Sequence, residues 1–227
     1  MNYKSGEKYE GQWKEGLKNG YGVFYFSKGD ILVGEWRDNE SDGFCKIYSV
    51  NGSISKGQCI NYQMNGYGQN DFADGRKYEG GYYNNSIDGY GIFYEKDGEK
   101  YEGQLKDGKK DGYGISEEKN GKYEGQFKND MKNGYGTFYL SNGDIKYEGQ
   151  WKDDKGDGYG IIYFSNKDRY EGQIKNDVSN GYGTMYYSKG QKYEGKWKDG
   201  RRNGCGIYYN AHGNKTQGIW KNDKKED

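Results

Sequence analysis

Proline, aliphatic residues and net charge are scarce or absent in this sequence. Its 227 residues include no Pro, and Leu and Val occur only four times each, too few for an ordinary aliphatic core between two layers. Lys plus Arg and Asp plus Glu number 35 each, so no global positive field attracts phosphates and we expect no nucleic-acid partner. Apolar runs stay far below the roughly 18 residues of a membrane span, and no secretory signal is recognisable.

Cysteine and histidine are also rare. Cys45, Cys59 and Cys205 are an odd number without paired spacing, which favours a reducing compartment over a disulfide framework. We therefore expect a soluble, cytoplasmic protein. Cys45 and Cys59 stand where related positions carry Gly or a ring, and we interpret them as small buried fillers that could lie near each other.

Glycine and aromatic rings make up for the missing aliphatic residues. The chain has 41 Gly, 27 Tyr, 8 Phe and 5 Trp, and its mean hydropathy is −1.35. Rings can bury a large apolar area even in a sequence with a polar average. The composition therefore favours a folded, glycine-spaced structure over a disordered chain.

An internal repeat of about 23 residues organises the sequence. Aligning on Tyr-Glu-Gly gives repeats that start near positions 9, 32, 55, 78, 101, 123, 147, 170, 193 and 216. The last repeat is truncated, and residues 1–8 read as the tail of a preceding one. We expect a single array over residues 1–227. The second and third repeats lose the anchor Tyr, at Leu32 and Ser55, either by degeneration or as a specialised partner surface.

Each repeat reads as one β-hairpin. Rings and Gly alternate with charged and polar residues over Tyr9–Lys14, which is the period of a strand with one solvated face. Asn19-Gly20 is expected to reverse the chain into a second strand, Tyr21–Phe26, and Ser27–Asp30 is expected to form the next turn. No window has a helical period, so we predict an all-β protein.

Hairpins of this kind are not stable alone and must stack. The predicted fold is an elongated single-layer antiparallel β-meander, a solenoid-like rod of stacked hairpins. Glycines without a Cβ let rings such as Tyr9 and Trp13 lie across neighbouring backbone, which replaces the missing second layer.

The combination of Tyr-Glu-Gly-Gln-Trp-Lys at 9–14 and Asn-Gly-Tyr-Gly at 19–22 resembles the MORN repeat, the membrane occupation and recognition nexus family. The resemblance covers nearly the whole chain. It implies a β-rod that acts as a scaffold or adaptor in ciliary, cytoskeletal or membrane-associated assemblies, and that is sometimes dimeric. Two departures stand out: Asn or Asp replaces the family's frequent His before the first hairpin Gly, and its usual Pro in the second turn is missing.

Catalytic chemistry is not indicated. His212 is the only histidine and aligns with turn residues, so neither a Ser-His nor a Cys-His pair is supported. The glutamates that recur from Glu10 to Glu194 are interpreted as pairing with the lysines that recur from Lys14 to Lys198. Asp38–Gly43 and Asp153–Gly158 resemble half of a calcium loop but lack the closing carboxylate. We predict no enzyme activity, no metal site and no cofactor.

The leading functional hypothesis is a non-catalytic scaffold that binds a protein partner, as an extended segment or a helix, along the aromatic face. Its candidate contacts are Tyr78, Tyr101, Tyr123, Tyr147, Trp151, Tyr170, Tyr193 and Trp197.

Two alternatives remain open, together with dimerisation. Anionic phospholipid could bind the Lys-rich loops, with Lys106, Lys109, Lys110, Lys198, Arg201 and Arg202 as candidates. A surface solenoid that holds choline or sugar on its rings would require export. A homodimer could form through the open strand edge at Tyr9–Trp13.

Overall fold

The computed structural model describes residues 1–226, which form twenty β-strands and no helix. The predicted all-β class is confirmed. The strands are β1 (Lys8–Lys14), β2 (Leu17–Tyr25), β3 (Ile31–Arg37), β4 (Glu40–Tyr48), β5 (Ile54–Ile60), β6 (Gln63–Asp71), β7 (Lys77–Tyr83), β8 (Ser86–Tyr94), β9 (Lys100–Lys106), β10 (Lys109–Glu118), β11 (Gly121–Lys128), β12 (Met131–Leu140), β13 (Ile145–Lys152), β14 (Lys155–Tyr163), β15 (Arg169–Lys175), β16 (Val178–Tyr186), β17 (Lys192–Lys198), β18 (Arg201–Tyr209), β19 (Lys215–Lys221) and β20 (Lys224–Lys225).

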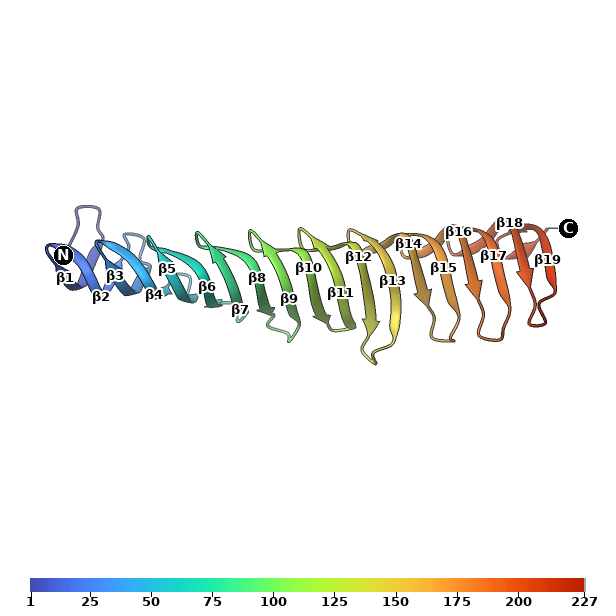
Figure 1. The fold of residues 1–227 in the computed structure, drawn as a ribbon, viewed down its shortest axis with the longest axis horizontal. Helices are drawn as coiled ribbons and strands as arrows, with labels where there is room; N and C mark the ends of the chain where they lie inside the picture. The colour runs from blue at the N-terminus through green and yellow to red at the C-terminus, as the bar shows by residue number, and fades with distance from the viewer. Residues whose placement is uncertain (227) are drawn as a thin grey trace. The chain divides into compact units, whose positions relative to one another are not determined.

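The strands form one antiparallel sheet in which each strand pairs with its neighbour in the chain, as β1 with β2 and β2 with β3. This meander of hairpins is the predicted one. The contacts group the chain into two units, Met1–Gly112 and Tyr113–Asp227, and in each unit consecutive strands lie side by side (Figure 1). Position 227, the last of the predicted array, lies outside the described residues.

The tight turn of each hairpin lies earlier in the repeat than the sequence analysis placed it. The chain reverses at a two-residue turn such as Asn84-Asn85, whose φ angles are 48° and 65°. Positive φ at both positions is the requirement of the type I′ hairpin turn, which Asn and Asp tolerate. The prediction that Asn19-Gly20 reverses the chain is wrong, because both residues lie within β2.

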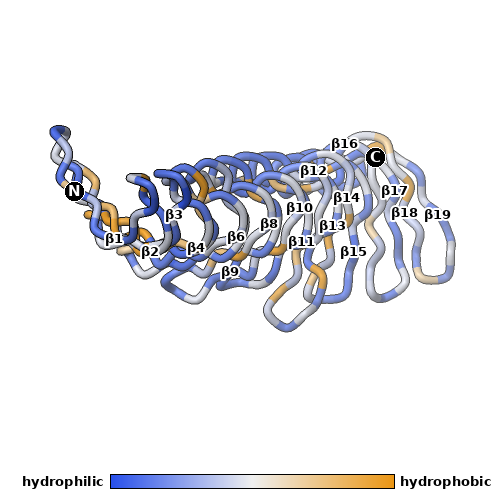
Figure 2. Tube along the Cα trace, turned by 60° about the vertical axis from the view of Figure 1, so that its left-hand side comes forward, coloured by the Kyte–Doolittle hydropathy of each residue, from blue (hydrophilic) through white to orange (hydrophobic). Residues whose placement is uncertain are grey.

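Gly20 instead makes a β-bulge. The register between β1 and β2 shifts between Gly11 and Trp13, and Gly20 has a φ of 80°. The Gln12 side chain covers the bulge, since its Oε1 accepts the backbone N–H of Tyr21 at 2.9 Å, and a Cβ at Gly20 would collide with this oxygen. Bulges bend strands, and the strands in Figure 2 are clearly bent.

The two faces of the sheet differ in how their side chains are buried. We call the side with the anchor tyrosines the inner face and the opposite side the outer face. On the inner face Tyr9 pairs with Phe24 and Gly11 pairs with Gly22. A Cβ at Gly11 would lie 2.6 Å from Tyr9 Oη, so this ring occupies the space that the glycine leaves. The prediction that glycines seat the rings is confirmed.

Ring-to-ring contacts link one repeat to the next. Tyr9 lies edge-on to Trp13 and to Trp36, with both centroid distances 5.1 Å. The Trp36 indole N–H donates to the Gly22 carbonyl at 3.2 Å. Each edge-to-face pair is worth about 0.5–1.5 kcal/mol beyond burial. Ring contacts therefore join several neighbouring repeats, whereas Cys59 and Met64 take the place of rings in the core of the third repeat.

The outer face is charged, but its ion pairs differ from the predicted ones. Glu102 pairs with Lys100 at 2.8 Å and Glu124 with Lys122 at 3.4 Å, so the partner is the cation two residues earlier on the same strand. The predicted pairing with the lysines that recur from Lys14 is wrong at these glutamates. Side chains two apart on a strand point the same way and are neighbours.

Cys45 and Cys59 are both buried, as expected, but a disulfide joins them across β4 and β5. The expectation of unpaired cysteines is corrected here. Cys45 pairs with Gly57 and Cys59 with Gly43, so the two cysteines are diagonal neighbours on adjacent strands, and their Cα atoms lie 5.8 Å apart. Cys205 is free and exposed.

The first residues fold back on the open edge of β1. Asn2 bridges to Lys8, and the Tyr9 backbone N–H donates to the Met1 carbonyl at 2.9 Å. The start of the predicted dimer edge at Tyr9–Trp13 is therefore covered by the chain itself. Dimerisation through this edge stays a prediction.

Candidate functional site

The eight rings predicted to contact a partner lie in the core. Their exposed fractions range from 0% at Tyr123 to 8% at Trp151. The anchor rings among them lie against glycine backbone and other core side chains; Tyr123, for example, lies edge-on to Phe127 of its own repeat and to Trp151 of the next. Their main role in the structure is packing, with little ring surface open to a partner. The buried residues are Tyr78, Tyr101, Tyr123, Tyr147, Trp151, Tyr170, Tyr193 and Trp197.

A second row of rings, which the sequence analysis missed, lies on the outer face. Seven of these residues stand between the two glycines of a Gly-x-Gly, and Phe44 stands between Gly43 and Cys45. Their exposed fractions run from 52% to 63%. The signal was available: the paired glycines Gly11 and Gly22 face inward, so Tyr21 must face outward. The row comprises Tyr21, Phe44, Tyr67, Tyr90, Tyr113, Tyr135, Tyr159 and Tyr182.

The inner face also holds cations among its rings. Lys18 is only 5% exposed, and its ammonium lies 4.7 Å from the Trp36 ring centroid and 4.8 Å from that of Phe24. Its Nζ donates to Tyr62 Oη at 2.6 Å. Burial lowers the pKa of Lys18. Cation–π attraction of about 2 kcal/mol or more at desolvated sites offsets part of this desolvation.

In three further repeats a cation at the same position lies over inner-face rings. Lys110 lies over Tyr101, Lys132 lies 4.9 Å from the Phe138 centroid, and Arg202 lies 4.3 Å from the Trp220 centroid. Lys110 and Arg202 were predicted as lipid contacts. Arg202 is instead turned to Trp220 and to Asp223, whose Oδ1 is 3.3 Å from its Nε.

Each unit has a hollow on the inner face. In residues 1–112 a hollow of about 520 Å³ is lined mainly by residues of the second to fourth repeats, including Ile47, Ser55, Tyr62, Asn70, Phe72 and Tyr82, with Phe26 and Asp30 of the first and Gly108 of the fifth. The Oη atom of Tyr82 is buried there without a hydrogen-bond partner. In residues 113–226 a hollow of about 510 Å³ is lined by Phe138, Leu140, Tyr147, Trp151, Ile162, Lys132, Lys146, Glu118, Asn120, Asp154 and Asp177.

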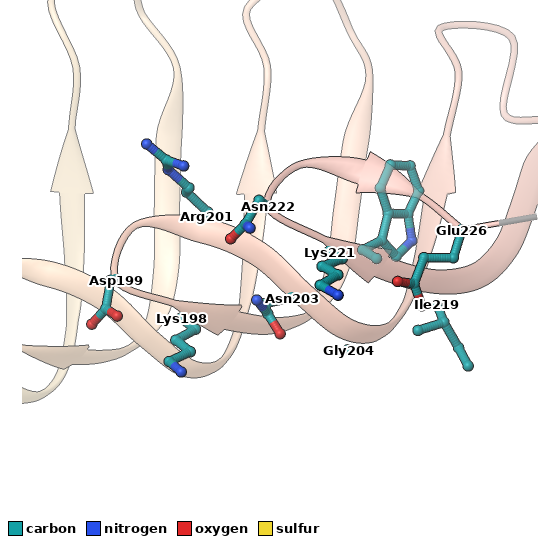
Figure 3. A pocket seen from close by; sticks show the side chains of 10 residues that line it. Lys198, Asp199, Arg201, Asn203, Gly204, Ile219, Lys221, Asn222 and Glu226 are labelled. Atoms are coloured by element: carbon teal, nitrogen blue, oxygen red, sulfur yellow. The ribbon is translucent and has the colours of Figure 1, made fainter.

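The Lys-rich loops predicted to bind lipid are exposed at Lys106, Lys109, Lys198 and Arg201. Lys198 and Arg201 line a more open hollow of about 790 Å³, together with Asp199 and Glu226 (Figure 3). Both signs of charge meet there, so this loop does not form a purely basic patch.

Titration behaviour follows burial. Burial raises the pKa of Tyr78 and of Tyr193 to about 12. His212 lies in an exposed turn, as predicted. Within residues 1–226 there is no group of three or more His, Cys, Asp or Glu placed to hold a metal ion. The described residues also contain no helix long and apolar enough to span a membrane.

Solved structures that match the chain do so only distantly. The wild-type TCP10 domain of Danio rerio CPAP is 12% identical over 97% of this chain and 99% of that chain, with a TM-score of 0.33. The SAS-4 TCP domain of Drosophila melanogaster, in complex with a proline-rich motif of Ana2, is 13% identical over 88% and 84%, with a TM-score of 0.24. Virginiamycin B lyase from Staphylococcus aureus is 10% identical over 95% and 88%, with a TM-score of 0.20. Likenesses this weak carry no argument about function.

Comparison with families is decisive. A search of curated proteins finds no match to the chain. The MORN repeat model matches residues 9–31, 33–54, 78–100, 101–117, 123–145, 147–169, 170–192 and 193–215. The unmatched third repeat is the one in which Ser55 and Cys59 replace the two core rings. With its hairpins, glycine-seated rings and eight matched repeats, the chain belongs to the MORN repeat family.

Proposed function

We propose that the chain is a non-catalytic scaffold that binds a protein partner, as an extended segment or a helix, on its inner face. The observation that carries the proposal is the hollow of about 510 Å³ in residues 113–226. Rings and aliphatic side chains line it together with charged groups, as in protein interfaces where apolar anchors are surrounded by polar contacts. The binding surface is thus the rim of the inner face, not the buried anchor rings.

The rim of the inner face, which we define by Phe138 and Leu140 at the hollow, has apolar side chains that a partner can contact. Leu140 is 39% exposed at the end of β12 and lines the hollow with Phe138, two residues earlier on the same face. These side chains project from paired strands, so they lose little entropy when a partner covers them. A partner that buried this rim would gain about 25 cal/mol for each Å² of apolar surface removed from water.

Photo-crosslinking tests which face binds. Benzoylphenylalanine is placed at Leu140 on the inner face, or at Tyr135 on the outer face of the same strand. Tyr135 is 63% exposed, so it is a matched control for reactivity. We expect one defined polypeptide to crosslink at position 140 and not at 135 in extract of the native cell. Crosslinking only at position 135 would refute the inner-face proposal.

Membrane binding is the competing proposal. The exposed cations Lys106, Lys109, Lys198 and Arg201 could contact anionic phospholipid, each worth about 1 kcal/mol near the surface. Sedimentation with phosphatidylserine vesicles separates the two proposals: salt-sensitive binding that a Lys198→Glu/Arg201→Glu variant loses would support the lipid function. The scaffold proposal also includes a cytoplasmic location at a cytoskeletal, ciliary or membrane-associated assembly.

Homodimerisation is a further proposal, through the part of the β1 edge that residues 1–2 leave uncovered. Light scattering tests it directly: a monomer at high concentration would refute it.

A further inference from the structure

The cations of the inner face occupy a repeated site, which we call the cation seat. The residue nine positions after the repeat start fills it, above the anchor Tyr. An Asn or Asp of the following turn accepts this residue's backbone N–H. Lys18 donates to Asn39 Oδ1 at 2.9 Å, Lys132 to Asp154 Oδ1 at 2.8 Å and Arg202 to Asp223 Oδ1 at 2.9 Å.

In the repeat that starts at 147 the same seat has no side chain of its own. Gly156 stands at the cation's position, and its backbone N–H donates to Asp177 Oδ1 at 2.7 Å, the bond seen in the filled seats. An added Cβ would point at the Tyr147 ring, 3.1 Å from Cζ. The backbone, the anchor ring and the turn carboxylate are therefore in place, while the cation is missing.

The empty seat borders a hollow lined by charges of both signs, Glu118, Asp154 and Asp177 together with Lys132 and Lys146. Tyr147 and Asp177 both line the hollow of about 510 Å³. Within residues 1–226, Asp177 has no ion pair, whereas Glu118 on the same hollow is paired with Lys132 at 2.7 Å. Burial raises the pKa of Tyr147, and the negative charges of Asp177 and Asp157 raise it further.

Among the seats that hold a small residue instead of a cation, only the Gly156 seat has a carboxylate in the following turn. Ser179 fills the corresponding place in the next repeat, above Tyr170, but the turn residue that would supply the acid is Gly200. That seat has rings without a carboxylate. It is a matched internal control for the contribution of charge.

We propose that the Gly156 seat binds the side chain of a lysine or arginine carried by the partner segment. The alkyl stem would pass over Tyr147 and Ile162, and the cationic head would reach Asp177, as the Arg202 guanidinium reaches Asp223 within the chain. The Lys132 ammonium pairs instead with Glu118. This inference rests on the proposed function and names the chemistry by which the partner is recognised.

The test measures the seat without the partner. The probes are Nα-acetyl-lysine-N-methylamide and its arginine counterpart. The norleucine analogue, which has the four-carbon stem of lysine without the ammonium group, is the uncharged control. Chemical shifts of the Gly156 amide and the Ile162 methyl groups report on the seat, and the Trp197 indole, beside the Ser179 seat, is the reference. We expect saturable millimolar shifts with the two cationic probes, none with norleucine and none at Trp197.

Two variants decide the mechanism. Asp177 has a φ of 68°, which Asn tolerates, so Asp177→Asn keeps the turn and is expected to weaken the cationic probes at least fivefold. Gly156→Lys fills the seat from within and is expected to abolish the shifts. The matched control Asp107→Asn, in an exposed turn with a φ of 50°, is expected to change nothing.

The outcomes separate the two proposals. No saturable shift, equal shifts with norleucine, or unchanged affinity in Asp177→Asn would overturn the seat. Probe binding without any crosslink at Leu140 would instead leave the seat standing and defeat the partner-binding function. If both the seat and the partner-binding function hold, replacing one Lys or Arg of the crosslinked segment by Gln is expected to lower its affinity for the wild-type chain at least tenfold. The same replacement is expected to leave the affinity for Gly156→Lys unchanged. Equal loss in both would place that cation elsewhere.

Discussion

At each anchor tyrosine the ring lies over two glycines that face each other across a strand pair. The sequence analysis derived this arrangement from the absence of Cβ atoms, and the contact of Tyr9 with Gly11 and Gly22 agrees. It did not predict that the rings are buried. Tyr9 is covered by Trp36 of the next repeat, and that cover depends on strand bending at the bulges, which period-2 patterning does not reveal.

Gly183→Ala tests the seating of a ring. Gly183 does not have positive φ, but its Cβ would overlap the buried Tyr170 ring, with Cε2 at 2.7 Å. We expect a loss of about 1–3 kcal/mol in the free energy of unfolding, measured in urea. Gly200→Ala is the control: nothing lies within 4 Å of its Cβ, and its φ of 79° limits the cost to about 1–2 kcal/mol of backbone strain. Wild-type stability of Gly183→Ala would contradict the packing account.

Buried tyrosine predicts a fall in stability at alkaline pH. The pKa of Tyr78 is about 12 in the fold and about 10 in an unfolded chain. The unfolded state loses this proton first, so the contribution is fully present below pH 10 and is lost as the pH rises from 10 to 12. Tyr78→Phe cannot ionise, and its stability deficit relative to wild type is expected to shrink over this interval. A deficit that stays constant between pH 9 and 12 would exclude the effect.

At the scale of elements, the repeat period and strand class were predictable, whereas the turn was not. Asn-Gly is the strongest hairpin signal, yet it forms the bulge here. The pair Asn176-Asp177 makes the turn with φ angles of 49° and 68°. In the sequence, Asn176-Asp177 and Asn180-Gly181 are both candidates for the hairpin turn. The pairing of Gly172 with Gly183 in the structure places the turn at the first pair.

Asn176→Val and Asn180→Val distinguish the two assignments within one repeat. Val tolerates positive φ poorly, so Asn176→Val is expected to cost about 1–2 kcal/mol of stability. Asn180 lies in β16, where Val is favourable, and it loses only a 3.3 Å hydrogen bond to Asp199. Urea unfolding of the two variants gives the comparison. A larger loss of unfolding free energy in Asn180→Val than in Asn176→Val would indicate that Asn180-Gly181 forms the turn.

The disulfide between β4 and β5 predicts a thiol count. In the oxidised protein, denatured without reductant, one of the three cysteines is expected to react with a thiol reagent, and all three after reduction. Three reactive thiols in both cases would show that Cys45 and Cys59 are merely packed together, as the sequence analysis expected. Cys205→Ser is the control that lowers each count by one.

At the scale of the molecule, family and fold class followed from sequence because the same chemistry recurs every 23 residues and leaves little choice of architecture. The proposed binding surface could not be predicted in the same way. The candidate residues were selected as the most regular rings, and regularity marks the core of a repeat. The proposed binding chemistry lies where the repeat changes, as at Gly156. Its neighbours Tyr147 and Asp177 are known only from the three-dimensional structure.

The central claim is that partners bind on the inner face, and one measurement tests it most directly. The affinity of the segment crosslinked at position 140 is compared in wild type, Leu140→Glu and Tyr135→Glu. Both variants place a charge at an exposed position of β12, on opposite faces. We expect Leu140→Glu to weaken binding at least tenfold, about 1.4 kcal/mol, and Tyr135→Glu to stay within twofold of wild type. Loss of binding in Tyr135→Glu with Leu140→Glu unaffected would contradict the account.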